Sequence, residues 1–183
     1  MRIVNSDEVF EKMIKNAGMT MKMNTALGRQ QEPERDKLRD VAKRVTLARQ
    51  KNFIEGRLGL IIDGTGKDYE KIEKQMRELQ VLGYESHMIF VNTSLDVALA
   101  RNQKRDRTLP EPIVVKSWNA VQKNIGKFSQ LFKNRFIILD NNDKDEDVLT
   151  GVFKRVRGLA NKKVTNGIAK AWIANELEMK RRV

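Results

Sequence analysis

The sequence predicts an α/β protein in which a parallel sheet is flanked by helices. Short apolar runs, rich in β-branched and aromatic residues, occur at residues 58–62, 88–91 and 136–139. These runs are too continuous for half-exposed strands, so both faces of each strand are expected to be covered, as in a parallel sheet. Helical patterns separate the runs, and this alternation is typical of a doubly wound fold.

The elements are expected in the following order. A weaker strand candidate, Arg2–Val4, opens the chain. Two amphipathic helices are predicted where apolar residues recur at helical spacing between charged residues. The first carries Leu38, Val41, Val45 and Ala48, and the second carries Tyr69, Ile72, Met76 and Leu79. Gly83 lies where the second of these helices should end.

The second half of the chain continues the alternation. Thr93, with Asp96 three residues later, has the spacing of a capping box that opens a helix over Leu95–Lys104. After the last strand, residues 147–160 and 168–180 are expected to form two helices that pack on the sheet or cover its edge. The 183 residues are enough for one ordinary domain, so residues 1–183 are expected to form a single domain.

Composition narrows the class of function. The net charge is +12, with 36 Lys and Arg against 24 Asp and Glu, so nucleic acid or a phosphorylated substrate is the favoured partner. The absence of cysteine excludes disulfides and thiolate metal sites, and the single histidine, His87, argues against a histidine-rich metal site. No apolar run is long enough to span a membrane, and no signal pattern opens the chain, so a soluble cytoplasmic protein is expected.

Polar residues follow each predicted strand. Ligands of open parallel sheets bind beyond the carboxyl ends of the strands, so these residues are expected to converge on one rim that forms the site. Asp and Asn are also common turn residues, which is the structural alternative. The residues are Asn5, Ser6 and Asp7, then Asp63, Gly64 and Thr65, then Asn92 and Thr93, and finally Asp140, Asn141 and Asn142.

Asp63 directly follows the apolar residues 60–62, an arrangement that many nucleotide hydrolases and kinases use to hold magnesium or to orient phosphate. A helix cap or turn is the alternative role for this residue. The run Gly64-Thr65-Gly66-Lys67 is not a phosphate loop, because G-x-x-x-x-G-K-S/T would require glycine at Ile61 and Ser or Thr at Asp68. No other stretch of the chain matches that motif.

A basic cluster, Arg101, Arg105 and Arg107, runs into a proline-containing segment. Arg101 and Arg105 are four residues apart and are expected to share a helix face, from which both guanidinium groups could reach one phosphate. The proline-containing segment would let this part close over a ligand as a lid. A solvent-exposed charged face is the alternative.

These pieces resemble the phage polynucleotide kinase and zeta-toxin-like group of P-loop kinases. The run Arg101-Asn102-Gln103-Lys104-Arg105, followed by Pro112 and Ser117, is similar to the lid of the polynucleotide kinase domain. Asn5-Ser6-Asp7 is similar to the second-strand segment of the family, whose aspartate accepts the proton of the substrate hydroxyl. Residues 60–65 resemble the third strand and residues 137–140 the last one.

The resemblance covers residues 2–142 and implies a kinase-like core over 1–142, with C-terminal helices over 143–183. In the family, a first strand, the Walker A loop and a first helix precede the segment that corresponds to Arg2, so this unit is expected to be missing. That first strand is typically central. Its omission is expected to leave unpaired strand edges, which invite a strand from a partner chain.

The resemblance implies an ATP- and Mg²⁺-dependent kinase portion that phosphorylates a hydroxyl group. Asp7 would be the general base, Asp63 a magnesium or phosphate-orienting carboxylate, and Arg101 and Arg105 would neutralise charge on the transferred group. Asn5, Thr65 and Arg107 would contact the substrate. A nucleic-acid 5′-hydroxyl is the preferred acceptor, and a sugar nucleotide of the zeta-toxin type is an alternative.

Two further alternatives remain open at this stage. The chain could be a non-catalytic binding protein that derives from a kinase fold and retains a basic surface. The basic residues of the first long helix could track a phosphate backbone, or they could form a solvated face interleaved with acidic residues. These basic residues are Arg35, Lys37, Arg39, Lys43 and Arg44.

Overall fold

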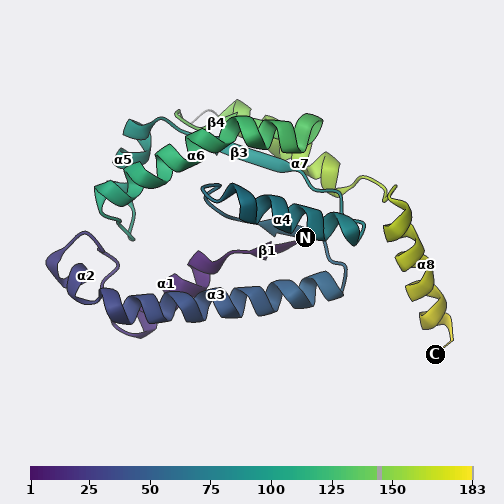
Figure 1. The fold of residues 1–183 in the computed structure, drawn as a ribbon, viewed down its shortest axis with the longest axis horizontal. Coiled ribbons are helices and arrows are strands. Elements are labelled where there is room, and N and C mark those ends of the chain that lie inside the picture. Colours follow the sequence, from purple (N-terminus) through teal and green to yellow (C-terminus); the bar gives the residue numbers. More distant parts are fainter. Residues whose placement is uncertain (144–145, 183) are drawn as a thin grey trace. The chain divides into compact units, whose positions relative to one another are not determined.

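The computed structural model describes residues 1–143 and 146–182, of which residues 146–148 are described by their backbone alone. Helices dominate, and the strands are short (Figure 1). The elements in chain order are β1 (Arg2–Val4), α1 (Ser6–Asn16), α2 (Ala26–Gln30), α3 (Glu32–Glu55), β2 (Leu60–Ile62), α4 (Tyr69–Val81), β3 (Met88–Asn92), α5 (Leu95–Lys104), α6 (Glu111–Phe132), the 3-10 helix η1 (Lys133–Arg135), β4 (Phe136–Asp140), α7 (Glu146–Ala160) and α8 (Gly167–Arg181).

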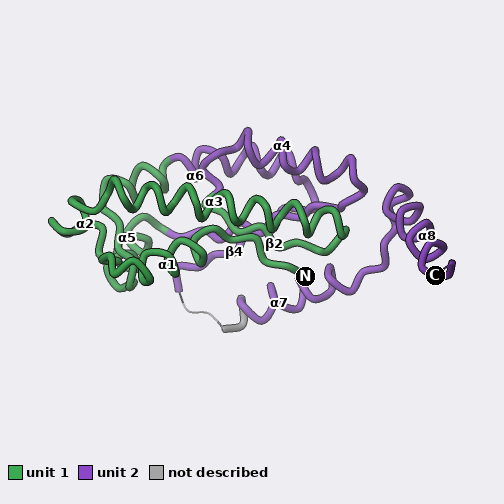
Figure 2. The backbone as a smooth tube through the Cα atoms, turned by 90° about the horizontal axis from the view of Figure 1, so that it is seen from below, with its two compact units in different colours: residues 1–65, 94–119 green, residues 66–93, 120–183 purple. Residues whose placement is uncertain are grey.

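The chain divides into two compact units, which are coloured separately in Figure 2. Unit 1 contains Met1–Thr65 and Ser94–Asn119, and unit 2 contains Gly66–Thr93 and Ala120–Val183. Each unit holds one two-stranded parallel sheet, β1–β2 in unit 1 and β3–β4 in unit 2. The expected α/β class with short parallel strands is therefore confirmed, while the strands form two small sheets.

Unit 1 is built on the packing of α1 against α3. Phe10 and Ile14 lie four residues apart on α1, so they share one helix face, and they are buried together with Met23 and with Ala42 of α3. Helix α1 begins at the residues expected to be a polar strand end, because the Asn5 side chain accepts a hydrogen bond from the Asp7 amide and caps the helix. The polar run after β1 is thus a helix start as well as a strand end.

Unit 2 has a core of aromatic side chains and one methionine. Phe90 of β3 and Met76 of α4 are buried with Phe128 and Phe132, both on α6. The strands pair from Met88 with Phe136 to Asn92 with Asp140. Phe90 pairs with Ile138, so Phe136, two residues before Ile138, is a diagonal neighbour of Phe90, and their rings meet at a centroid separation of 6.0 Å, within the range of favourable aromatic pairs.

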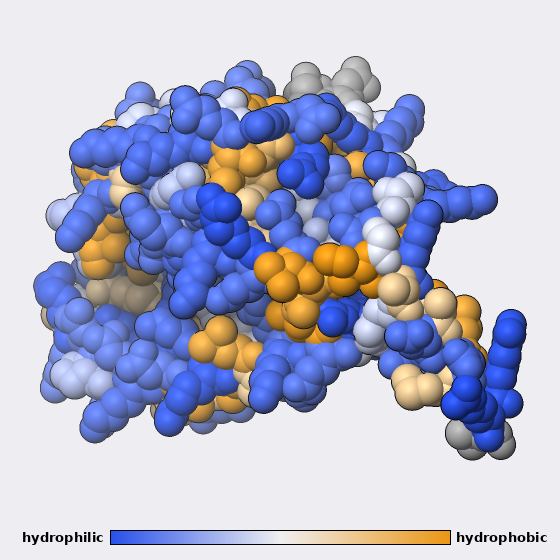
Figure 3. Space-filling view, turned by 45° about the vertical axis from the view of Figure 1, so that its right-hand side comes forward, coloured by the Kyte–Doolittle hydropathy of each residue, from blue (hydrophilic) through white to orange (hydrophobic). Residues whose placement is uncertain are grey.

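The expectation that both faces of each strand are covered is wrong. In unit 1, Ile61 and Ile62 of β2 remain 43% and 39% exposed. In unit 2, Val91 of β3 and Ile138 of β4 remain 53% and 54% exposed. An apolar run indicates only that a strand should be covered. The elements that could cover it come from distant parts of the sequence, and the described elements cover these strands only in part. Apolar side chains accordingly reach the surface (Figure 3).

Several helices agree with expectation and others do not. Helix α5 has the expected bounds, although its cap is Ser94, which accepts from the Val97 amide, and not Thr93. Gly83 follows the end of α4 with φ of +91°, as expected of a residue that ends a helix. Helix α6 was not expected, because prolines were interpreted as a lid segment. Pro112 lies in its first turn, where a missing backbone N–H costs no hydrogen bond.

Unit 2 should lose stability in acid because of His87. Burial lowers the pKa of the His87 imidazole below its usual 6.5, and the positive charge of Arg135 lowers it further. The unfolded chain therefore binds a proton more readily than the folded chain, so the free energy of unfolding falls as the pH drops through about 6.5. Urea denaturation of the wild type and of His87→Gln, at about pH 7.5 and about pH 5, should show a smaller acid loss in the variant. An equal loss in both proteins would contradict this assignment.

Candidate functional site

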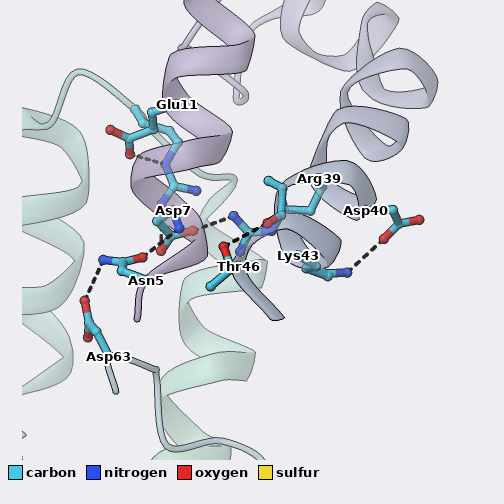
Figure 4. Close-up of polar contacts among 10 residues, drawn as sticks. Asn5, Asp7, Glu11, Arg39, Asp40, Lys43, Thr46 and Asp63 are labelled. Atoms are coloured by element: carbon cyan, nitrogen blue, oxygen red, sulfur yellow. Dashed lines mark hydrogen bonds and ion pairs between the residues drawn. The ribbon is translucent and has the colours of Figure 1, made fainter. Parts of the chain in front are cut away.

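The carboxyl ends of β1 and β2 meet at one edge of the unit 1 sheet. Val4 pairs with Ile62, and the Asp63 amide donates to the Val4 carbonyl at 3.0 Å. The next residues therefore face each other, and the Asn5 amide nitrogen donates to Asp63 Oδ2 at 2.8 Å (Figure 4). The parallel arrangement brings these two predicted residues together as expected. In unit 2, Asn92 and Asp140 likewise end β3 and β4 as a register pair.

Asp7 lies in the first turn of α1, next to this edge. Its carboxylate oxygen Oδ1 accepts a hydrogen bond from Arg39 Nη1 of α3. Its other oxygen, Oδ2, lies 3.4 Å from Arg107 Nη2. Both carboxylate oxygens are thus engaged by guanidinium groups, while the Asp7 side chain remains 40% exposed to solvent.

Arg107 is the more enclosed of the two arginines, with a side chain that is 16% exposed. Its Nε donates to Glu11 Oε1 at 2.8 Å. Both guanidinium groups also lie near the buried ring of Phe10, with Arg39 at 4.7 Å from the ring centroid and Arg107 at 5.9 Å. The ring face favours cations, so Phe10 and the two carboxylates together hold the arginine pair in place.

The segment that carries Arg107 is anchored to the loop that precedes α2. The Thr108 amide donates to Met21 O at 3.2 Å, and the Met23 amide donates to Thr108 O at 3.0 Å. The Thr108 hydroxyl donates to Asn24 Oδ1 at 2.6 Å, and Lys22 Nζ donates to the carbonyl of Arg105 at 2.8 Å. Because Thr108 is buried, the stretch expected to be a lid is tied to unit 1 at this point.

The prediction that Arg101 and Arg105 share a helix face is wrong. Helix α5 ends at Lys104, and Arg105 follows with extended backbone at φ −74° and ψ 154°. Arg107, predicted as a substrate contact, is the member of the basic cluster that lies against Asp7. Glu11 was not predicted, although its spacing of four residues from Asp7 on α1 was a signal that the two share a helix face.

Three of the basic side chains of α3 pair with other groups of the protein. Arg35 is 7% exposed, and its Nη1 donates to Gly28 O at 2.5 Å. Arg39 pairs with Asp7, and Lys43 pairs with Asp40 at 3.0 Å on the exposed side of the helix (Figure 4). The described contacts thus direct Arg35 and Arg39 to other parts of unit 1, so neither belongs to a wholly solvated face. The sequence marked Arg39 only as one of five basic residues on this helix that could track a phosphate backbone or lie on a solvated face.

The loop after β2 gives no phosphate grip. Thr65 is exposed in this loop and follows Asp63 and Gly64. In unit 2, the carbonyls of Gly66 and Lys67 both accept from Asn124 Nδ2 at 3.1 Å. The Asp68 carboxylate caps α4 by accepting from the Lys71 amide, so negative charge already occupies the helix N-terminus that a phosphate would need. This geometry agrees with the rejection of the Gly64–Lys67 run as a phosphate loop.

The residues at the carboxyl ends of β1 and β2 fit magnesium in part. Mg²⁺ prefers oxygen ligands and is commonly held by one or two carboxylates together with waters and substrate phosphates. The exposed Asp63 carboxylate fits as one such ligand, although no group of three His, Cys, Asp or Glu side chains suited to a metal is present in residues 1–143 and 146–182.

No helix within the described ranges has both the length and the apolarity needed to cross a bilayer.

A comparison with protein families finds a match over most of the chain. A family model described as Zeta toxin matches residues 24–150, more than half of the chain. The matched region includes Arg39, Asp63, Arg101, Arg105 and Arg107, whereas the segment that carries Asp7 precedes it. No curated protein matches the chain. No solved structure matches it either.

Proposed function

Because the chain belongs to the zeta toxin family, we propose that it forms the acceptor-binding part of a kinase that transfers the γ-phosphoryl group of ATP to a hydroxyl. The family supports a kinase-like nucleotide-binding function. The observation that carries the proposal is the meeting of Asn5, Asp7 and Asp63 at the carboxyl ends of two parallel strands, the usual place of ligand binding in such sheets.

Each residue has a proposed role. Asp7 accepts the proton of the attacking hydroxyl, and Asp63 holds Mg²⁺ or orients phosphate. Arg101 and Arg105 neutralise the charge that builds up on the transferred group, a role worth about 10³- to 10⁵-fold when arginine supplies it. Asn5, which donates a hydrogen bond to Asp63, and Thr65, two residues after Asp63, contact the substrate.

We propose that the phosphate-binding loop for ATP is supplied by a polypeptide segment that carries G-x-x-x-x-G-K-S/T, either upstream of these residues or in a partner chain. Two observations support this proposal. The motif does not occur in the 183 residues, and each sheet in the described residues has two strands, so an added strand could pair with the backbone of an outer edge. ATP and Mg²⁺ are the cofactors that the proposal requires.

Two acceptors are considered. The net charge of +12 favours a nucleic-acid 5′-hydroxyl, because a strongly basic protein attracts polyanions. Membership of the zeta toxin family favours a sugar nucleotide as the second candidate. If the chain is instead a basic binding protein without catalysis, it will bind oligonucleotides in a salt-dependent manner and transfer no phosphate.

A transfer assay separates these functions. Radiolabelled ATP and Mg²⁺ are incubated with the chain, alone or with the polypeptide that carries the phosphate-loop motif. The acceptors are a 5′-hydroxyl oligonucleotide, the same oligonucleotide already phosphorylated at its 5′ end, and a sugar nucleotide. Label is expected on the 5′-hydroxyl oligonucleotide and not on its blocked counterpart. Label on the sugar nucleotide alone would replace the preferred acceptor, and no label on any acceptor in the combined sample would contradict the kinase function.

A further inference from the structure

We propose that Arg39 and Arg107 form a binding site for a phosphate group of the acceptor, and that the Asp7 carboxylate occupies this site until the acceptor arrives. The inference rests on the proposed function, since it concerns the acceptor side of the same site. It adds a substrate class, namely acceptors that carry a phosphate close to the reacting hydroxyl. It also distinguishes Arg39 from the other basic residues of α3, any of which could track a phosphate backbone on the evidence of the sequence alone.

The geometry is that of an anion site with an internal occupant. Arg39 approaches one oxygen of Asp7, and Arg107 approaches the other at 3.4 Å. The two arginine side chains are 32% and 16% exposed, so neither guanidinium group is freely hydrated. Guanidinium groups donate hydrogen bonds to the oxygens of carboxylate and phosphate alike. A phosphodiester of a nucleic acid offers two free oxygens, as the Asp7 carboxylate does, and a terminal phosphate offers three.

The charges and the access also suit an incoming anion. Glu11 engages Arg107 through Nε, which leaves the Nη2 atom of Arg107 directed at Asp7. Phe10 holds both guanidinium groups near its ring, so they can remain in place when the anion between them is exchanged. The Asp7 side chain is 40% exposed, and a ligand can therefore reach the arginine pair from solvent.

Exchange of the anion would link acceptor binding to catalysis. With both oxygens engaged by arginine, the Asp7 carboxylate is poorly placed to accept a proton. When an acceptor phosphate takes over Arg39 and Arg107, the carboxylate is released. It can then take the proton of the hydroxyl as that oxygen bonds to the γ-phosphorus of ATP and the bond to ADP breaks. Neutral hydroxyl compounds cannot make this exchange and should be poor acceptors.

Phosphate binding can be measured without ATP or turnover. Inorganic phosphate is titrated into the ¹⁵N-labelled chain, and the Nε–Hε resonances of Arg39 and Arg107 are followed. In Asp7→Asn the internal competitor loses its charge, so phosphate affinity should rise about two- to fivefold, the range expected for one charge contact at a partly exposed site. Arg39→Met should lower the affinity of the wild type by about the same factor.

The Asp40–Lys43 pair on α3 provides matched controls, because it is exposed and faces away from Asp7 (Figure 4). Asp40→Asn and Lys43→Met should leave phosphate affinity unchanged. Arg107→Lys keeps a positive charge at the enclosed position and should bind phosphate more weakly than the wild type, while its melting temperature reports whether the fold survives. Equal phosphate affinity in the wild type, Asp7→Asn and Asp40→Asn would overturn the proposal.

Two further ligands separate the origin of the phosphate. An uncharged nucleoside should cause no shift of the two arginine resonances. Stronger shifts with Mg²⁺ and ATP than with inorganic phosphate would assign the arginine pair to the nucleotide and overturn the acceptor assignment. Because these measurements need no transfer, a failed kinase assay with intact phosphate binding would contradict the proposed function alone.

Discussion

Replacing Asp7 with Asn is expected to slow phosphate transfer by about 100- to 10,000-fold, the range over which a positioned general base contributes to catalysis. Asparagine keeps the size of the side chain and one oxygen that can accept from Arg39 or Arg107, but it cannot take the proton of the hydroxyl. The loss should appear in kcat in the assay that combines the chain with the phosphate-loop polypeptide. Phosphate affinity should rise in the same variant.

The combination of slower transfer and tighter phosphate binding is specific to a carboxylate that acts as a base and competes with the ligand. If the Asp7 carboxylate only stabilised the fold, its replacement would lower the melting temperature and would weaken both phosphate transfer and phosphate binding. Asp40→Asn, in an exposed pair on α3, is the matched control and should retain wild-type transfer. Transfer at the wild-type rate by Asp7→Asn would remove Asp7 as the base.

Replacing Phe128 with Ala is expected to destabilise unit 2 by about 3–5 kcal/mol, the usual cost of truncating a buried aromatic side chain. Phe128 is 0% exposed, and its ring lies 5.5 Å from that of Tyr69, centroid to centroid. It also packs near the Gly66 backbone, so its loss should loosen the start of the loop before α4. Urea denaturation monitored by circular dichroism measures the change in the free energy of unfolding.

Phe153 of α7 is the matched control, since it lies in the same unit but is 65% exposed. Phe153→Ala should change the free energy of unfolding by less than about 0.5 kcal/mol, as expected of surface substitutions. A destabilisation of similar size in both variants would show that the aromatic cluster around Phe128 is not the main source of stability in unit 2.

The sequence predicted helix α5 to its exact bounds and the ends of α4 and α8 closely, because these segments combine helical periodicity with local capping residues. Helix α1 was missed because the signal for its start, Asn5 followed by Asp7, also follows a strand and was interpreted as a strand end. Helix α6 was missed because prolines at a helix start resemble those of a loop until the rest of the helix is recognised.

The site was predicted in part for a similar reason. Asn5 and Asp63 could be paired from sequence, since parallel strands end at one edge and each residue directly follows a strand. Arg39 could not be identified, because one basic residue among several on α3 carries no mark of the side chain it will meet. Its partner Asp7 is 32 residues away in the sequence and is brought close by the packing of α1 on α3.

Residue types and their spacing were enough to predict the α/β class, most of the helices, the strong positive charge and the polar residues that follow the strands. Those properties depend on residue type and on spacing within one or two turns of chain. Two findings required the folded structure: the strands form two small sheets with exposed isoleucines, and Arg39 and Arg107 meet at Asp7. The physical reason is that burial and ion pairing depend on which distant segments pack together, and local periodicity carries no information about that choice.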